Sequence, residues 1–173
     1  GNVPQRMGNA HPNIVPYQDF PTADGNMILT VGNDGQFKKF CEVAGRPEWA
    51  VDARYATNPA RVANRRELVT AIAEVTRTRT TQAWIDALES AQVPCGPVNT
   101  IDQVFADPHV VARGTRIELP HATGGTVAMP RNPIRFGASP IAAKAAPPLL
   151  DADHESILRD WLAASMETVP QQV

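Results

Sequence analysis

The sequence lacks every short motif that would assign a chemistry by itself. Neither phosphate-binding pattern, G-x-x-x-x-G-K-S/T or G-x-G-x-x-G, occurs in its 173 residues, and the G-x-S-x-G nucleophile elbow is also missing. No C-x-x-C pair is present, and the four histidines do not have the spacing of metal ligands. These histidines are His11, His109, His121 and His154. The sequence therefore predicts no metal site and no phosphate-binding loop of a known type.

Cysteine, net charge and long apolar runs are also scarce. Two cysteines, Cys41 and Cys95, cannot form a disulfide framework, and we expect both to be reduced thiols. The formal net charge is −2 and no run of lysine or arginine occurs, which argues against a nucleic-acid partner. No apolar run approaches the roughly 20 residues that span a bilayer, and no secretory signal pattern is found. We expect a cytoplasmic protein without a membrane segment.

The opening segment, residues 8–25, reads GNAHPNIVPYQDFPTADG and shows neither helical nor strand periodicity. It is either a frayed terminus or a functional loop, because long structureless segments in compact domains are usually sites or linkers. Tyr17 and Phe20 argue against full disorder, since aromatic side chains favour burial. His11 is the one histidine that we hold as a site candidate. Asp24 is expected to serve a tight turn with the glycine that follows it.

Apolar periodicity predicts one strand and three helices in the first half of the chain. The expected ranges are 27–31 for the strand and about 34–44, 64–76 and 80–91 for the helices. Between the first two helices, residues 52–61 are predicted to be a polar connection after a short turn that starts at Pro47. Arg65 and Arg66 at the start of the second helix either hold an anion or form a solvated helix face.

Proline punctuates the second half. Residues 93–98 (VPCGPV) must be extended, because two prolines frame a glycine there. A T-x-x-Q capping box and a D-P helix start predict two short helical turns within residues 99–114. The remaining expected segments are a β-hairpin at 115–129, an extended Pro/Ala arm at 130–148 and a last helix that begins at Asp151 or Asp153.

No βαβ series is present, so the sequence predicts an α+β fold with local packing and no self-contained doubly wound sheet. The elements group into two regions. Residues 1–98 are expected to form a small α+β domain with its N-terminal loop. Residues 99–173 are expected to contain the connecting helices, the hairpin, the arm and the C-terminal helix.

Several short phrases stand in a characteristic order along the chain. They are Gly8–Pro12 (GNAHP), Pro16-Tyr17, the R-x-x-N-R pattern of Arg61, Asn64 and Arg65, Val93–Val98 (VPCGPV), Asp107-Pro108, and Ala112-Arg113-Gly114. In this order they resemble the family III CoA-transferases, the CaiB/BaiF group. The ending at residues 146–154 resembles the family's closing A-P-x-L-G-E-H-T, although Leu150 replaces the Gly and Asp153 the Glu. Each phrase is weak alone, and their order over about residues 5–162 makes the match specific.

The resemblance implies that this chain corresponds to the C-terminal part of such a protein. That part is the small domain, a short antiparallel sheet with helices, followed by the hairpin, arm and last helix. The N-terminal Rossmann-like half, with most CoA-binding residues and the catalytic aspartate, is absent. In the family this aspartate attacks an acyl-CoA thioester, and the acceptor carboxylate finally takes the CoA. The resemblance therefore implies no catalytic residue here, and neither Asp19 nor Asp24 can inherit that role.

The resemblance also implies a lid. In some members a glycine-rich loop of the small domain covers the acyl pocket, and we take the matching positions as substrate-lid candidates: Gly8, Asn9, Ala10, His11 and Tyr17. Coenzyme A or an acyl-CoA is the implied substrate, with no metal. The family also includes 2-methylacyl-CoA racemases, and the residues that distinguish the two branches lie outside this sequence.

Two functional hypotheses of different class follow. In the first, the chain works as part of a CoA-transferase acting on an acyl-CoA and a carboxylic acid, and requires an N-terminal half. In the second, it is a stand-alone binding or interaction module derived from a truncated transferase. Family members form interlocked dimers, so the resemblance implies a homo-oligomer or a complex with an N-terminal CoA-transferase half.

Overall fold

The computed structural model describes residues 3, 6–143 and 145–162. The chain divides into two compact units, Gly1–Asn99 (unit 1) and Thr100–Val173 (unit 2). Both units mix helices with antiparallel strands, so the predicted α+β class is confirmed.

Unit 1 is built on a three-stranded antiparallel sheet in the order β1-β2-β3. The strands are β1 (Tyr17–Pro21), β2 (Asn26–Thr30) and β3 (Cys95–Pro97). In the central strand Met27 and Leu29 are fully buried, while Ile28 between them is partly exposed. This alternation directs one face of the sheet into the core. The strand expected at 27–31 is confirmed with its bounds moved by one residue.

The expectation that residues 8–25 contain no strand is wrong for β1. Phe20 lies opposite Met27, and the turn between the strands is closed by a 2.9 Å hydrogen bond from Thr22 N to Gly25 O. The strand exists because β2 pairs with it. Residues 8–25 contain three prolines, and nothing in their own sequence indicates this pairing.

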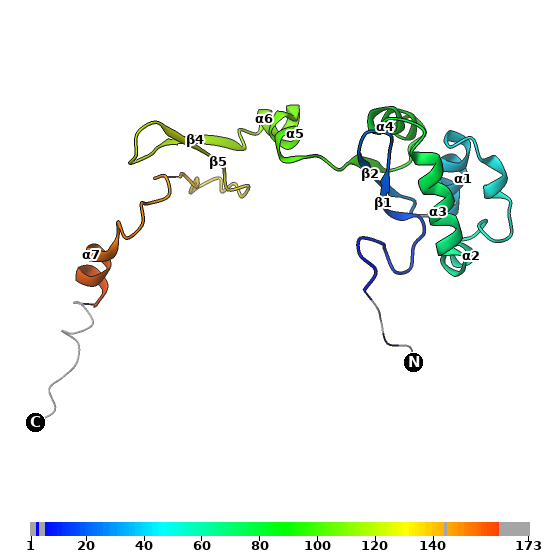
Figure 1. Ribbon diagram of the computed structural model, residues 1–173, viewed down its shortest axis with the longest axis horizontal. Coiled ribbons are helices and arrows are strands. Elements are labelled where there is room, and N and C mark those ends of the chain that lie inside the picture. Colours follow the sequence, from blue (N-terminus) through cyan, green and yellow to red (C-terminus); the bar gives the residue numbers. More distant parts are fainter. Residues whose placement is uncertain (1–2, 4–5, 144, 163–173) are drawn as a thin grey trace, which may run out of the picture. The chain divides into compact units, whose positions relative to one another are not determined.

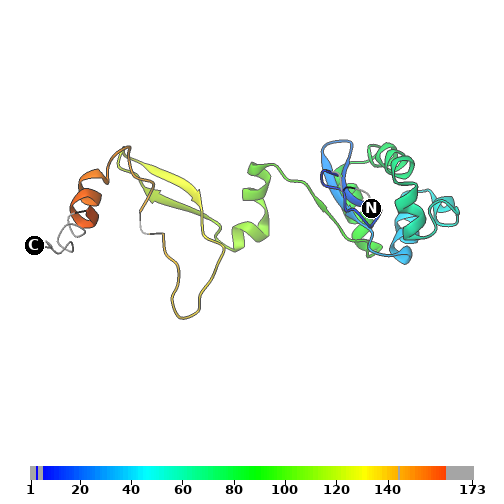
Figure 2. The ribbon, with the colours of Figure 1, turned by 90° about the horizontal axis from the view of Figure 1, so that it is seen from below.

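Helices cover one face of this sheet, and α1 and α3 lie on the same side of the β1–β2 hairpin (Figure 1, Figure 2). The elements are α1 (Asp34–Val43), the 3₁₀ turn η1 (Pro47–Ala50), α2 (Asn58–Ala63), α3 (Arg65–Thr76) and α4 (Thr81–Ser90). Four of them, α1, η1, α3 and α4, begin within one residue of the predicted position. The Asn33 side chain caps α1 by accepting a 2.9 Å hydrogen bond from Gln36 N, and Thr80 caps α4.

Helix α2 corrects the prediction of a polar connection over residues 52–61. It starts at Asn58 after an N-cap at Thr57, with Pro59 in its first turn. A helix of six residues is too short to show an apolar stripe, so periodicity could not reveal it. Its Arg61 is fully buried.

The core of unit 1 lies between the sheet and these helices. Trp84 is its largest buried side chain, and its indole Nε1 donates a 2.7 Å hydrogen bond to Thr76 O. Thus the one polar atom of the ring is paired inside the core. The other large, fully buried apolar side chains are Phe20, Phe37, Phe40, Met27, Leu29, Leu68, Ile72 and Leu88.

Asp24 joins the hairpin turn to the start of α4. Its Oδ1 accepts hydrogen bonds from Thr81 N at 2.7 Å and from Thr81 Oγ1 at 2.9 Å. These bonds, the backbone one first, lower the pKa of Asp24 below its usual value of 3.8. The carboxylate therefore has a structural partner beyond its own turn.

We expect Asp24→Asn to lower the thermal midpoint at neutral pH, because the charged acceptor is lost. The folded-state pKa lies below the unfolded one, so this stabilisation is present above the unfolded value of 3.8 and is lost as pH falls through the folded pKa. Melting curves of both proteins between neutral pH and about pH 2.5 test this, since their midpoints should converge in acid. A constant difference over the whole range would contradict the assignment.

Unit 2 contains the predicted short helices and hairpin. The elements are α5 (Ile101–Ala106), α6 (Pro108–Ala112), β4 (Arg116–Pro120), β5 (Thr126–Pro130), α7 (His154–Ile157) and a π-helical turn, η2 (Leu158–Leu162). Gln103 completes its half of the capping box, since its Oε1 accepts a 2.9 Å hydrogen bond from Thr100 N. None of the described residues of this unit, 100–143 and 145–162, is buried.

Candidate functional site

The candidate site is the opening loop of unit 1, residues 6–16, which precedes β1. Gly8 has a φ of +62°, a left-handed conformation that glycine adopts without strain. Ala10 N then donates a 3.2 Å hydrogen bond to Met7 O, which closes a tight turn. The described part of the loop therefore has a defined turn, and the reading of a frayed terminus is wrong for residues 7–16.

The loop folds back onto the beginning of β1. His11 N donates a 2.9 Å hydrogen bond to Tyr17 O, and the two rings stack with centroids 5.2 Å apart and planes 20° apart. Asn9 Nδ2 donates a 3.3 Å hydrogen bond to Asp19 Oδ1. The structure thus brings three of the lid candidates, Asn9, His11 and Tyr17, together along one strand, while Gly8 and Ala10 form the turn beside them.

Side chains of helices α2 and α3 hold the loop by hydrogen bonds to its backbone. Arg61 Nε donates to Val15 O at 2.6 Å, and Arg65 Nη2 donates to His11 O at 2.8 Å and to Pro12 O at 2.7 Å. Asn58 adds two bonds, from its Nδ2 to Asn13 O at 2.8 Å and from Val15 N to its Oδ1 at 3.2 Å. The arginines of the R-x-x-N-R pattern are loop-binding groups. The hydrogen bonds of Arg65 to the loop therefore correct both hypotheses made for it from the sequence, an anion-binding site and a solvated helix face.

Arg61 is the group that sequence reasoning missed. Besides its bond to the loop, its Nη1 donates to Tyr55 O at 2.9 Å and its Nη2 to Asp34 Oδ1 at 2.8 Å. The guanidinium also lies 4.4 Å from the ring centroid of Phe37. A fully buried charge is tolerated when its donors are paired, as they are here. The R-x-x-N-R spacing was the one available signal, because the two arginines are one helical turn apart.

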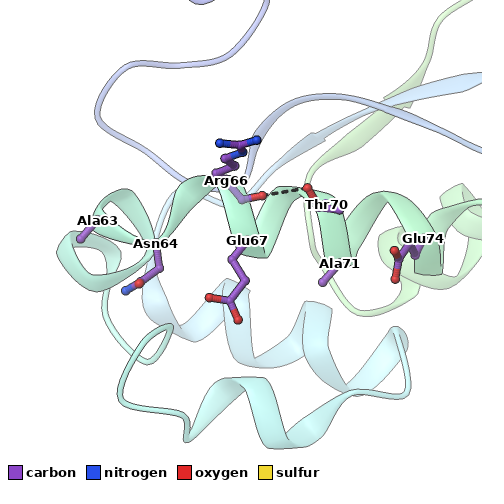
Figure 3. A pocket seen from close by; sticks show the side chains of 7 residues that line it. All are labelled: Ala63, Asn64, Arg66, Glu67, Thr70, Ala71 and Glu74. Carbon is purple, nitrogen blue, oxygen red and sulfur yellow. Dashed lines mark hydrogen bonds between the residues drawn. The ribbon is translucent and has the colours of Figure 1, made fainter.

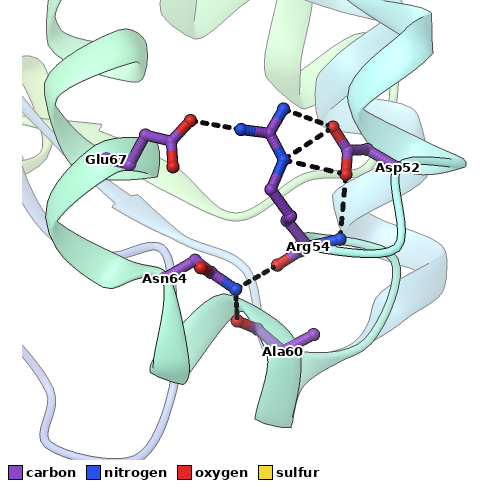
Figure 4. A network of polar contacts seen from close by, with 5 residues as sticks. All are labelled: Asp52, Arg54, Ala60, Asn64 and Glu67. Carbon is purple, nitrogen blue, oxygen red and sulfur yellow. Dashed lines mark hydrogen bonds and ion pairs between the residues drawn. The ribbon is translucent and has the colours of Figure 1, made fainter.

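A second polar network braces the α2–α3 junction (Figure 4). Arg54 lies between Asp52, with Nη2 to Oδ2 at 2.7 Å, and Glu67, which its Nη1 contacts. Hydrogen bonding to Arg54 lowers the pKa of Asp52. Asn64 Nδ2 donates to Arg54 O at 3.2 Å and to Ala60 O at 3.0 Å, so the Asn of the pattern ties α2 to the preceding segment.

An open groove of about 620 Å³ runs along the exposed side of α3 (Figure 3). It is lined by Ala63, Asn64, Arg66, Glu67, Thr70, Ala71 and Glu74. One cation and two carboxylates line it, and Glu67 is already paired with Arg54. This arrangement offers no nucleophile with an activating base, so the groove does not compete with the loop as a chemical site.

The other titratable candidates lie apart from the loop. Burial raises the pKa of the Cys41 thiol to about 12, so this cysteine is a core side chain and no thiolate nucleophile. Burial also raises the pKa of Cys95, and both cysteines are free. Among the described residues, no three His, Cys, Asp or Glu side chains gather as a metal site would require. None of the helices in the described part of the chain has the length and apolar content of a bilayer span.

Comparison with known proteins identifies the family of this loop and its scaffold. Residues 1–154 match the family description "CoA-transferase family III". The chain belongs to this family. It is 42% identical over 169 residues to the succinate–glutarate CoA-transferase of Agrobacterium fabrum, an alignment that covers 98% of this chain and 41% of that protein. It is also 36% identical over 158 residues to the human succinyl-CoA:glutarate CoA-transferase, covering 91% of this chain and 36% of the human protein.

A solved structure agrees with the family III assignment. The crystal structure of a CaiB/BaiF family protein from Brucella suis is similar with a TM-score of 0.76 and 42% sequence identity. The superposition covers 92% of this chain and 41% of the Brucella suis protein. This family III chain therefore spans about two fifths of the length of these relatives.

Proposed function

We propose that this chain is the C-terminal portion of a CoA-transferase that moves CoA from an acyl-CoA to a carboxylic acid. The observation that carries the proposal is the alignment of nearly the whole chain, at 42% identity, with a succinate–glutarate CoA-transferase. Other relatives of the chain include an acetyl-CoA:oxalate and a succinyl-CoA:mesaconate CoA-transferase. The acceptors in these names are dicarboxylic acids, and we assign a dicarboxylate acceptor to this protein as well.

The chain by itself does not supply the nucleophile in this proposal. Transfer through a covalent carboxylate intermediate needs an aspartate that is free to attack the thioester. In unit 1, Asp24 is held by Thr81, and its lowered pKa makes it a weaker nucleophile. Asp19 accepts a hydrogen bond from Asn9. In this proposal the catalytic aspartate belongs to an N-terminal half outside this sequence, and we expect the chain alone not to be catalytic.

The opening loop contributes a lid over the acyl group in this proposal. Its turn at Gly8–Ala10 and its His11–Tyr17 stack lie at the start of β1. Tyr17 is 39% exposed, so one side of this stack is available to a ligand or to the preceding portion of the enzyme. A lid excludes water from the thioester and so protects the reactive intermediate from hydrolysis.

Unit 2 supplies the contact with a further protein surface. Many of its large apolar side chains are exposed, including Ile157, Leu158, Trp161 and Leu162 of the last helical segment. Exposed apolar residues in such a group indicate an interaction surface. We assign this surface to the N-terminal portion of the transferase or to the same portion in a second copy, which gives a homo-oligomer.

A chimera tests the proposed function. The portion of the Agrobacterium fabrum transferase that precedes the aligned region is joined to this chain, and the intact relative serves as the positive control. We expect the chimera to transfer CoA between succinyl-CoA and glutarate, and this chain alone to show no transfer. A folded chimera without transferase activity would overturn the proposal.

The alternative function, a stand-alone binding module, is favoured by the closed core of unit 1, which needs no further domain to be complete. Calorimetric titration of this chain with CoA and succinyl-CoA discriminates between the two functions. A Kd at or below about 1 μM, about −8 kcal/mol, would support the module. Absence of heat would support the dependent portion of an enzyme.

A further inference from the structure

The two arginines that hold the opening loop differ in burial and in how many of their nitrogens have a hydrogen-bond acceptor. Arg61 is fully buried, and each of its three nitrogens has an acceptor. Arg65 is only partly buried and holds the loop with Nη2 alone, which bridges two neighbouring carbonyl oxygens. Its Nη1 is the one buried side-chain nitrogen or oxygen in the described part of the chain that lacks a hydrogen-bond partner.

This difference has an energetic consequence. A buried donor without an acceptor loses its hydration and gains nothing in return, so it opposes the closed arrangement in which it occurs. Displacing the loop at Arg65 costs two hydrogen bonds, but it exposes Nη1 to water or to another acceptor. Displacing the loop at Arg61 would instead pull the fully buried Val15 out of the core and leave the buried Nε of Arg61 without its acceptor.

The attachment points divide the loop at residue 13. Asn58 and Arg61 hold Asn13 and Val15, which therefore stay with the core. Within the loop, Asn13 N donates a 3.1 Å hydrogen bond to His11 Nδ1. The contacts that hold residues 8–12 to the rest of the domain are those with Arg65, the His11–Tyr17 backbone bond and ring stack, and the Asn9–Asp19 bond. Of these, the Asn9–Asp19 bond and the Arg65 bond to Pro12 O lie at exposed positions, where water competes.

We propose that Arg65 is a positioning residue that acts as a releasable latch for loop residues 8–12, whereas Arg61 is the fixed anchor of residues 13–16. In the closed state the latch places His11 against Tyr17. In the open state Arg65 gives up both carbonyls and the segment leaves β1. Arg65 acts through the loop, and it is not a catalytic residue.

The consequence for catalysis depends on the proposed function, whereas the latch itself does not. In a CoA-transferase a loop that opens and closes without unfolding the domain would admit the acyl-CoA and then exclude water. The freed guanidinium is also a donor of the kind that binds a substrate carboxylate. A latch of this type sets the population of the closed loop.

Amide hydrogen exchange on the complete chain, measured by NMR, tests the latch directly. We compare the native chain with Arg65→Met, with the conservative Arg65→Lys, and with Arg66→Met as the matched control. Arg66 is the exposed neighbour on the same helix, and its side chain makes no hydrogen bond or ion pair within the described residues. The reporters are the amides of Ala10 and His11, and the reference amides are those of β2.

We expect Arg65→Met to speed exchange at Ala10 and His11 by about tenfold, with β2 unchanged, because only a local opening is affected. Arg65→Lys should give an intermediate rate, since an ammonium group can still bind a carbonyl, and Arg66→Met should match the native chain. Unchanged exchange in the loop would overturn the proposal. Equal acceleration in the loop and in β2 would overturn it too, because Arg65 would then be an ordinary core contact. Neither result depends on transferase activity, so a failure of the latch is distinct from a failure of the proposed function.

Discussion

Arg61→Met is expected to lower the free energy of unfolding of unit 1 by about 3–5 kcal/mol, because it removes one partner from a buried, charged hydrogen-bond network. Methionine fills much of the space, but it leaves the buried carbonyls of Val15 and Tyr55 without a donor. The contact of the guanidinium with Phe37 is lost as well. Asp34 is half exposed and can be hydrated again, so it adds little to the loss.

Urea denaturation of the complete chain, followed by tryptophan fluorescence, measures this effect. Arg77→Met is a suitable control, since Arg77 is exposed and its Nη1 donates to Ala73 O of its own helix at 3.2 Å. Its effect should stay below about 0.5 kcal/mol. Arg61→Lys should fall between the two, because one ammonium group cannot reach three acceptors in the geometry of a guanidinium. A loss below about 1 kcal/mol for Arg61→Met would show that the network is not the anchor we describe.

The elements that the sequence predicted correctly carry their signal locally. Helices α1 and α4 have a capping side chain, Asn33 or Thr80, followed by apolar residues at helical spacing. The extended segment that contains β3 was predicted from two prolines around Gly96. In each case residues within one or two turns determine the backbone conformation, so one sequence is sufficient.

The elements that were missed depend on partners far away in the sequence. Strand β1 is a strand because β2 pairs with it, and Arg61 is buried because Val15, Tyr55 and Asp34 converge on it. The R-x-x-N-R spacing singles Arg61 out, but no residue near it in the chain indicates that its side chain is buried. Polar residues of this kind become predictable only when the tertiary contacts are known.

The candidate site shows the same division. Resemblance pointed to residues 8–11 and 17, but the chain's own pattern gave no reason for His11 to stack on Tyr17 or for Arg65 to hold His11 O. The lid role of these residues remains a prediction. Their geometry explains how a loop rich in Gly, Pro and Asn can have one conformation, since its carbonyls are bound by side chains of α2 and α3.

The last helical segment shows that an apolar stripe at helical spacing predicts a helix but does not identify the surface that covers the stripe. Ile157, Leu158, Trp161 and Leu162 recur at helical spacing, as a buried stripe would. They are 42–75% exposed, and α7 gives way to a π-helical turn at Leu158. An apolar stripe predicts burial against something, and the surface that would cover it is not among the described residues of unit 2.

We therefore expect residues 100–173, produced alone at low concentration, to show no cooperative thermal unfolding. The described residues of this segment, 100–143 and 145–162, form a two-stranded hairpin and short helices with no buried residue, which cannot offset the entropy of ordering the chain. Residues 1–99 produced alone should unfold cooperatively with the midpoint that unit 1 has in the complete chain, because the core of unit 1 is closed. Circular dichroism melts of the three chains measure this difference.

The conditions that restore cooperativity would identify the surface that covers unit 2. Cooperative unfolding of residues 100–173 that appears only at high chain concentration would indicate a second copy, because association then supplies the buried area. Cooperativity that appears only in the chimera with the preceding portion of the Agrobacterium fabrum transferase would assign the surface to that portion. A sigmoidal melt of the isolated, monomeric segment would contradict the expectation, since unit 2 would then have a core of its own.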